Sequence, residues 1–336
     1  LVKIIDMEVK QIPINNEDLQ RFNSDCYTFK EHPLSMLEPY HQVFPSLYMD
    51  HHKSFQEAEV YEDDVWICTF PKSGTRWMQE IVSCLRNGLD FEKAKSSPLG
   101  LRVPFFDFSA VSCNAEKMLK AYGSSCKTGA ELVNHTLRPR TIKTHLSYEM
   151  LPPKIHEKGA KMINVIRNPR DVCVSFLNHH VLTENYTGDL QTIAEIMLQD
   201  VGPIYAPFFT HILSYWNQRE NPNLLIVHYE EMQKDVTGVI KRVAKFIGTE
   251  EYSDGQIAKL VEHTSVDKMR ANPMVNVTGP IDKLKAAMKN EQKGTFINTG
   301  KTGGWKNKLT EETIERFKKW EEKWLKDTGL LFVYEV

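Results

Sequence analysis

The sequence lacks the features of several classes of protein. No run of about 18 apolar residues, the length that spans a bilayer, occurs among its 336 residues. Charges interrupt the apolar residues at its start, which is not the pattern of a secretory signal peptide. Lysine and arginine total 42 against 44 acidic residues, and no basic block occurs. We therefore expect a cytoplasmic protein with neither nucleic acid nor a membrane as a partner.

The chain also lacks paired cysteines and an obvious linker. Its six cysteines have no regular spacing, and Cys68, Cys84 and Cys173 lie in apolar patterns. This favours buried free thiols over a disulfide framework or a zinc site, and we expect no bound metal. No Pro/Gly/Ser-rich stretch divides the chain, which predicts one domain over 61–336. Residues 1–60 show no sustained periodicity and are expected to wrap that domain as irregular structure and short strands.

The most informative stretch is Val65–Trp77. It begins with an apolar run of strand type, Pro71 ends the run, and Gly74 permits a tight turn before a helical pattern. Such a junction presents free backbone N–H groups and the positive end of a helix dipole, here beside Lys72, which predicts a phosphate site. The lysine precedes the glycine, unlike the order in nucleoside triphosphate loops. For Pro-Lys-Ser-Gly alone, an ordinary surface turn remains the alternative.

Buried strands alternate with helical patterns along the chain. This alternation predicts an α/β fold with a central parallel sheet of about five strands and helices on both faces. Ligands bind at the carboxyl ends of such strands, where this sequence places Lys72, Lys143, His145 and Arg167. The expected strands are 65–70, 141–144, 162–166 and 224–227, and the expected later helices are 171–180, 190–200, 206–218, 235–246, 256–263 and 310–326.

Several ordered motifs resemble those of the cytosolic sulfotransferases. The resemblance covers roughly residues 64–331 and implies the sulfotransferase fold, with a P-loop-like phosphate-binding loop. It also implies the donor 3′-phosphoadenosine 5′-phosphosulfate (PAPS), which is released as PAP, and it suggests an insect-type member near the retinol dehydratase branch. The motifs are Phe-Pro-Lys-Ser-Gly-Thr-Arg-Trp at 70–77, Arg-Val-Pro-Phe at 102–105, Lys-Thr-His-Leu at 143–146, Arg-Asn-Pro-Arg-Asp-Val-Cys-Val-Ser at 167–175, His-Tyr-Glu-Glu-Met at 228–232, His-Thr-Ser at 263–265 and Gly-x-x-Gly-x-Trp-Lys at 300–306.

The resemblance assigns roles to individual residues. His145 is the candidate general base, and Lys72 and Lys143 would stabilise the charge that develops during transfer. Arg167 and Ser175 would hold the 3′-phosphate, for which the planar fork of arginine is suited. Core packing remains the alternative for Tyr229. The whole predicted donor site is Lys72, Ser73, Gly74, Thr75, Arg76, Trp77, Arg167, Ser175, Tyr229, Thr264, Phe296, Ile297, Asn298, Thr299 and Gly300.

The acceptor pocket is marked mainly by aromatic residues. The stretch around Phe105 and Phe106 is too apolar for a solvated loop, so it lines a cavity, as the resemblance favours, or plugs the core. Tyr40 and Tyr48 are further pocket candidates, with core packing as the alternative. The stretch 114–135, longer than in many relatives, is a lid or a passive insertion. We expect a small hydrophobic acceptor with a hydroxyl group: a phenol, a sterol or a retinoid.

Two departures from the family pattern keep other interpretations open. The usual Arg-Lys-Gly of the C-terminal loop is Asn298-Thr299-Gly300, which removes up to two charged contacts to the 3′-phosphate unless Lys301 or Arg76 compensates. The alternatives are a non-catalytic small-hydrophobe binding protein with impaired PAPS binding, and sulfonation followed by elimination on an allylic alcohol. Glu311 replaces a valine of the dimer motif, so a monomer and a homodimer both remain open.

Overall fold

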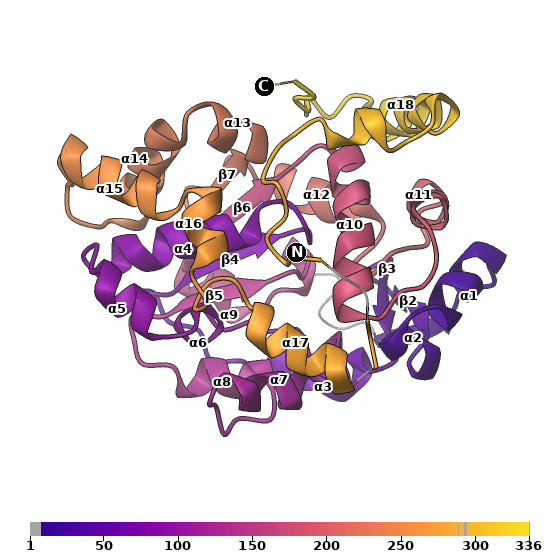
Figure 1. Cartoon of the computed structure of the whole chain (residues 1–336), viewed down its shortest axis with the longest axis horizontal. Coiled ribbons are helices and arrows are strands. Elements are labelled where there is room, and N and C mark those ends of the chain that lie inside the picture. Colours follow the sequence, from indigo (N-terminus) through magenta and orange to yellow (C-terminus); the bar gives the residue numbers. More distant parts are fainter. Residues whose placement is uncertain (1–7, 288, 292–293, 336) are drawn as a thin grey trace.

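The computed structural model describes residues 8–287, 289–291 and 294–335 (Figure 1). Its centre is a parallel sheet in the order β5 (Thr141–Thr144), β4 (Val65–Thr69), β6 (Lys161–Ile166) and β7 (Leu224–His228). The parallel α/β class is confirmed, and the sheet has four strands in the described residues where about five were expected. The Phe105 segment adds only an isolated bridge to Lys143, because Pro104 has no N–H with which to extend a ladder.

The two faces of the sheet are covered by different layers, as alternate residues of β4 show. Val65 and Ile67 pack in a core with α4 (Thr75–Arg86) and α14 (Val236–Ile247). Trp66 and Cys68 face the other core, which includes α12 (Phe208–Trp216) and side chains from the N-terminal segment. Successive strand side chains point to opposite faces, so an apolar run such as this one belongs to a strand buried on both sides.

The helix that follows β6 is long and well capped. α10 (Pro169–Thr183) begins two residues before the expected start because the Asn168 side chain accepts a hydrogen bond from the Asp171 N–H and Pro169 occupies the first turn. The remaining helices are α5 (Phe91–Ser96), α6 (Leu99–Arg102), α7 (Ala115–Ala121), α8 (Gly129–His135), α9 (Lys154–Lys158), α11 (Leu190–Leu198), α13 (Tyr229–Lys234), α15 (Asp254–His263), α16 (Val266–Ala271), α17 (Thr278–Ala287) and α18 (Glu311–Leu325). Short 3-10 helices in the described residues cover Phe108–Ala110, Tyr148–Met150 and Gly304–Asn307.

The N-terminal segment is more regular than expected. Its described part, from residue 8 on, forms a separate antiparallel sheet and also contains three helices that were not expected from the sequence. The first of these helices is only eight residues long, too short for a clear period, and is stabilised by the Asn16 side chain, which accepts from the Leu19 N–H at 2.9 Å. The elements are β1 (Lys10–Pro13), β2 (Leu34–Glu38), β3 (Gln42–Pro45), α1 (Glu17–Ser24), α2 (Tyr27–Glu31) and α3 (Tyr48–Gln56).

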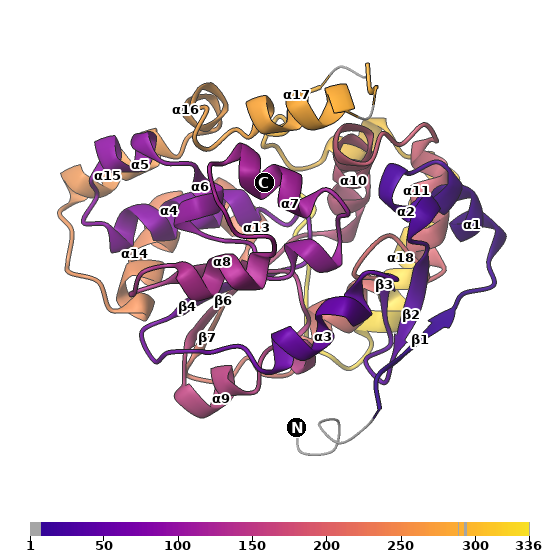
Figure 2. The same cartoon turned by 90° about the horizontal axis from the view of Figure 1, so that it is seen from below.

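The insertion at 114–135 lies beside the C-terminal part of the chain. Met118 of α7 packs with Val277 and with Ile281 of α17 in a small apolar cluster. Figure 2 shows α7 and α17 on the same side of the molecule, away from α9. The insertion is therefore a contact surface for α17.

The cysteines agree with the expectation of free, mostly buried thiols. All six thiols are free, and all except Cys113 are buried. Among the residues that the structure describes, no helix combines the length and the apolar composition that crossing a bilayer requires.

Candidate active site

The loop between β4 and α4 has the geometry that its glycine predicts. Gly74 has φ +104°, and a Cβ at this position would lie 2.5 Å from Tyr229 Cδ2. Only glycine satisfies both the left-handed backbone and the close contact. Lys72 is also left-handed, with φ 69°, which is strained for a residue with a side chain and is found most often at functional sites.

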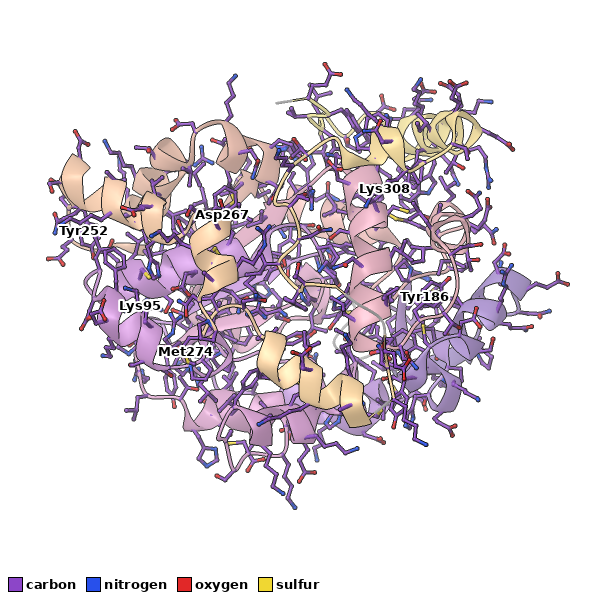
Figure 3. The ribbon with its side chains drawn as sticks, viewed as in Figure 1. Lys95, Tyr186, Tyr252, Asp267, Met274 and Lys308 are labelled. Carbon is purple, nitrogen blue, oxygen red and sulfur yellow. The ribbon has the colours of Figure 1, made fainter. Side chains whose placement is uncertain are left out.

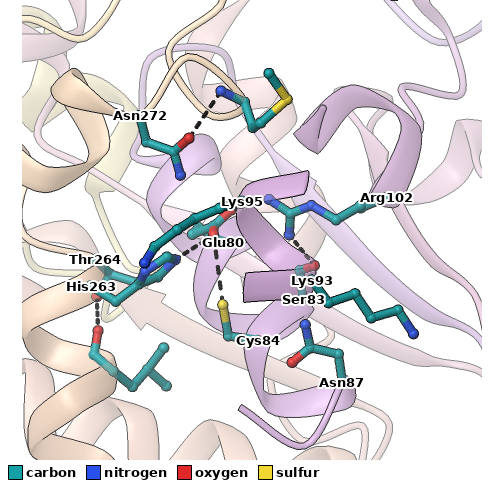
Figure 4. Close-up of polar contacts among 12 residues, drawn as sticks. Glu80, Ser83, Cys84, Asn87, Lys93, Lys95, Arg102, His263, Thr264 and Asn272 are labelled. Atoms are coloured by element: carbon teal, nitrogen blue, oxygen red, sulfur yellow. Dashed lines mark hydrogen bonds and ion pairs between the residues drawn. The ribbon is translucent and has the colours of Figure 1, made fainter. Parts of the chain in front are cut away.

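The ends of this loop are tied together by buried polar groups. The Thr69 and Thr75 hydroxyl oxygens lie 2.6 Å apart, which connects the end of β4 to the first turn of α4. On the far side of α4, Glu80 accepts from Arg102 at 2.7 Å and lies 2.8 Å from His263 Nε2 (Figure 4). With Cys84, Glu80 and His263 have the spacing of a metal-binding group, but Arg102 already neutralises Glu80. We interpret this cluster as an ion-pair support that fixes α4.

His145 follows β5 and faces the loop. Its Nδ1 lies 2.6 Å from the Thr69 carbonyl oxygen, which can only accept, so Nδ1 carries the proton. In the neutral ring, Nε2 is then free to accept a proton. Burial, with the charge of Lys143 added, lowers the pKa of His145 well below its usual value, so the ring is neutral at physiological pH.

A buried carboxylate holds the His145 backbone. Asp107 accepts hydrogen bonds from the Thr144 hydroxyl at 2.7 Å, the Tyr205 hydroxyl at 2.6 Å and the His145 N–H at 3.2 Å. Burial raises the pKa of Asp107, and these three donors and Lys143 oppose that effect. Asp107 and Tyr205 therefore position His145, and the sequence analysis singled out neither.

Two lysines lie in the same buried space. Burial lowers the pKa of Lys72 to about 7, with Arg76 and Arg167 adding to the effect. Burial also lowers the pKa of Lys143 to about 7, with Arg76 adding, while Asp107 opposes the shift. Desolvated cations that lack a full set of anionic partners are poised to bind an anion.

These groups surround one cavity of about 740 Å³. The loop, both lysines and His145 line it. Apolar side chains line it as well, among them Phe29, Phe105, Phe108, Val111 and Ile204. The cavity therefore combines a cationic region with an apolar one, and His145 lines it as well.

Arg167 connects the first loop to the C-terminal loop. Its guanidinium donates to the carbonyl oxygens of Lys72 and Lys301, each at 3.1 Å, and lies 4.3 Å from the centre of the Tyr229 ring. Its Nε has no hydrogen-bond partner among the described residues. Ser175, on α10, lines the same cavity.

A family model and several relatives match this chain. The model described as the sulfotransferase domain covers residues 62–329. The chain belongs to the sulfotransferase family. The predicted class, a PAPS-dependent sulfotransferase with PAP as the product of the donor, is therefore confirmed.

The most similar relatives include insect and mammalian sulfotransferases. Luciferin sulfotransferase of Photinus pyralis is 33% identical over 300 residues, which cover 86% of this chain and 78% of that protein. Human sulfotransferase 1E1 is 30% identical over 86% of this chain and 94% of its own. Among solved structures, retinol dehydratase with androsterone and inactive cofactor PAP is 26% identical with a TM-score of 0.84, covering 97% of this chain and 98% of the other.

Most residues of the predicted sulfotransferase site line the cavity. Phe105 and the predicted donor-site residues other than Ser73 all do so. Ser73 is fully buried, and its hydroxyl has no partner among the described residues. Arg76 does not point to solvent: it donates to the Val275 carbonyl at 2.7 Å and lies 4.8 Å from the Phe296 ring centre.

Three predicted acceptor residues lie outside the cavity lining. Phe106 is buried against Phe55 and Trp66, so the backbone that brings Phe105 to the cavity turns its neighbour into the core. Tyr48 packs with Phe44 and Phe55, and Tyr40 lies beside His52. The N-terminal segment does contribute to the cavity, through Phe29.

Two lysines in or just after the altered C-terminal loop reach the cavity. Lys301 and Lys308 both line the cavity. Figure 3 shows Lys308 just before α18, near the end of α10 that begins at Pro169. Arg270 donates to the Asn298 carbonyl at 2.8 Å and fixes this part of the loop. The sequence signal for Lys308 was its place after the Gly-x-x-Gly-x-Trp-Lys motif, which was not sufficient to single it out.

Proposed function

We propose that this sulfotransferase moves the sulfuryl group of PAPS to the hydroxyl of a small hydrophobic acceptor, with His145 as the general base. The observation that carries the proposal is the hydrogen bond from His145 Nδ1 to the Thr69 carbonyl. It selects the tautomer whose Nε2 accepts a proton, in a cavity where the His145 ring lies 5.1 Å from the Phe105 ring and both lysines line the same space.

The residues at the two loops fit PAPS. The left-handed Gly74 leaves backbone N–H groups exposed at the start of α4, where the helix dipole favours a phosphate. Lys72, Arg76 and Lys143 lie near this loop, and the unpartnered Nε of Arg167 can take a further oxygen. We assign Arg167 and Ser175 to the 3′-phosphate, and Trp77 and Tyr229 to the adenine.

The bound donor would supply an activated sulfuryl group with a phosphate as the leaving group. His145 would take the acceptor hydroxyl proton at Nε2, and its ring orientation is fixed by Thr69. Lys72 and Lys143 would hold positive charge beside the transferred group, since desolvated ammonium groups act more strongly there than in water. The surrounding apolar side chains would keep water, a competing acceptor, away.

The acceptor follows from the apolar part of the cavity. Phe105, Phe108 and Val111 suit a rigid hydrophobic body better than a sugar. The similar retinol dehydratase was solved with androsterone and with retinol, both small hydrophobic alcohols. This supports phenols, sterols and retinoids as the compounds to screen.

Transfer of labelled sulfate from PAPS to a panel of phenols and alcohols tests the function. We expect wild-type protein to form sulfate esters, and the His145→Gln variant to lose about 10²–10⁴-fold in kcat, the usual contribution of a general base. PAP binding by the variant should remain within about twofold of wild type. A variant that keeps full kcat would refute the role of His145.

A second outcome of the same chemistry is favoured by the likeness to retinol dehydratase, which extends over 97% of the chain. With an allylic alcohol, sulfonation followed by elimination would give net loss of water. Incubation with retinol and PAPS distinguishes the outcomes: a stable retinyl sulfate opposes elimination, and anhydroretinol without a stable sulfate supports it.

A further inference from the structure

The apolar part of the cavity contains buried polar groups that the transfer reaction does not use. His180 is 1% exposed and Glu184 is 5% exposed, and both line the cavity. Neither ring nitrogen of His180 has a hydrogen-bond partner within the described part of the chain. A buried polar side chain without partners costs stability unless a ligand satisfies it.

The surroundings of His180 explain why no protein group reaches it. The ring stacks on Phe176, with centroids 5.2 Å apart, and meets the Phe22 edge at 5.1 Å. Burial, and the charge of Lys72, lower the pKa of His180 to about 3, so the ring is neutral. A neutral imidazole offers one N–H donor and one nitrogen acceptor.

Glu184 is held beside this ring by the N-terminal segment. It lies one helical turn after His180, at the C-terminal cap of α10, so the two residues share a helix face. Its Oε2 accepts from the Thr28 N–H at 2.9 Å, and Tyr27 N–H donates to its carbonyl at 2.6 Å. Burial raises the pKa of Glu184 to about 7, so the carboxyl can both accept and donate near neutral pH.

This pair lies at the C-terminal end of α10, beyond Ser175, to which we assign the 3′-phosphate. Glu184 follows Ser175 by nine residues on α10, or roughly 13 Å at the rise of an α-helix. Figure 3 shows Tyr186, two residues beyond Glu184, at the opposite end of α10 from Lys308. Along α10 the cavity is lined mostly by polar side chains, among them Ser175, His179, His180 and Glu184, and most of its apolar lining comes from other segments, such as Phe29, Phe105 and Val111.

We infer that the acceptor has a second hydroxyl group, distant from the one that is sulfonated, which hydrogen-bonds with His180 and Glu184. This inference rests on the proposed function and narrows its substrate class to rigid or extended apolar molecules with an oxygen function at each end. A hydroxyl fits because it donates to a carboxylate while accepting from an imidazole N–H. A purely hydrocarbon end would leave both ring nitrogens of His180 unsatisfied.

Matched acceptors test the inference by binding as well as by turnover. The probes are 4-alkylphenols of four to ten chain carbons, each paired with the phenol whose chain ends in a hydroxyl. Calorimetric titration into PAP-loaded protein gives the affinity ratio of each pair. At the chain length that reaches α10 we expect a preference of about tenfold for the hydroxyl-ended phenol, the value of one good hydrogen bond.

The variants are chosen so that they fold. His180→Phe keeps the stack on Phe176 and loses no protein hydrogen bond. It should abolish the preference for the hydroxyl-ended phenol, so that both members of a pair bind equally. Glu184→Gln retains an oxygen that accepts from the Thr28 N–H and should weaken the preference. The control is His156→Phe, a histidine whose ring lies against Tyr148, with an unpartnered Nδ1, outside the cavity lining. It should keep the full preference.

The outcomes separate this inference from the function on which it rests. Equal binding of both members of every pair, or a preference that survives in His180→Phe, would overturn the inference while sulfate transfer to the phenols could continue. Binding with the expected preference but without sulfate transfer from PAPS would instead overturn the proposed function.

Discussion

Gly74 packs so closely on the ring of Tyr229 that a Cβ at position 74 would lie 2.5 Å from Tyr229 Cδ2. The glycine of the first loop therefore does more than permit a turn. It lets Tyr229, from the start of α13, close over the loop, while Tyr229 in turn donates to the Gly300 carbonyl at 2.7 Å. The Tyr229 side chain thus connects both predicted phosphate loops.

Gly74→Ala is expected to weaken PAP binding by at least about tenfold, since the loop must shift away from Tyr229 and from its left-handed conformation. Calorimetry measures the effect. The control is Gly123→Ala, which also has a positive φ but has nothing within 4 Å of the added Cβ. If the two variants bound PAP equally well, the contact would have no role in the donor site.

Tyr205→Phe is expected to lower both stability and kcat. It removes the donor 2.6 Å from Asp107, a buried carboxylate that also holds the His145 N–H. Loss of a hydrogen bond to a buried charge costs roughly 1–3 kcal/mol, which urea unfolding can measure. Tyr252→Phe removes a bond of 2.7 Å to the Leu85 carbonyl, outside the cavity lining, and should leave kcat unchanged. An unchanged kcat in Tyr205→Phe would show that Asp107 positions His145 without the hydrogen bond from the Tyr205 hydroxyl.

PAP binding is expected to take up protons above pH 7. In the free protein, burial lowers the pKa of Lys72 and of Lys143 to about 7, so at pH 8 both are largely neutral. A bound phosphate favours the charged forms and raises both pKa values, so PAP affinity should fall as pH rises above 7. Titration at pH 8 in buffers of different ionisation enthalpy counts the protons. The Lys72→Arg variant, whose side chain stays charged, should take up about one proton fewer when PAP binds. If wild-type protein took up no protons on binding PAP, the result would contradict this account.

Lys301 and Lys308 are expected to replace the missing Arg and Lys of the C-terminal loop. Both line the cavity, so each alanine variant should lose about tenfold in PAP affinity, within the range for hydrogen bonds to a charged group. Lys306→Ala is the matched control, because Lys306 pairs with Glu335 and does not line the cavity. Unchanged PAP affinity in both the Lys301 and the Lys308 variants would show that neither lysine replaces the missing Arg and Lys.

The sequence predicted the parallel sheet and the strand ends well, because buried parallel strands read as apolar runs and Pro71 and Gly74 mark where the first of them ends. It predicted the N-terminal segment poorly, because helices such as α1 are short and stabilised by caps and by distant core contacts. Phe106 shows the same limit: adjacent aromatic residues look alike in sequence, yet only the backbone direction decides which one faces the cavity.

The residues that were missed depend on contacts between distant segments. Asp107 and Tyr205 are 98 positions apart, and Glu184 meets Thr28 across 156. No local pattern brings such pairs together, so only the fold could show that Tyr205 and Glu184 line the cavity and that Asp107 and Thr28 hold them.

The most direct test of the account is a calorimetric titration of the purified protein with PAP beside the same titration with ADP, which lacks the 3′-phosphate. We expect tight binding of PAP and binding of ADP weaker by about tenfold or more. The reason is that Arg167, Ser175, Lys301 and Lys308 would act on the 3′-phosphate alone. Equal affinities, or no binding of PAP, would contradict the donor site proposed for this sulfotransferase and would favour a protein that binds small hydrophobic molecules without transferring sulfate.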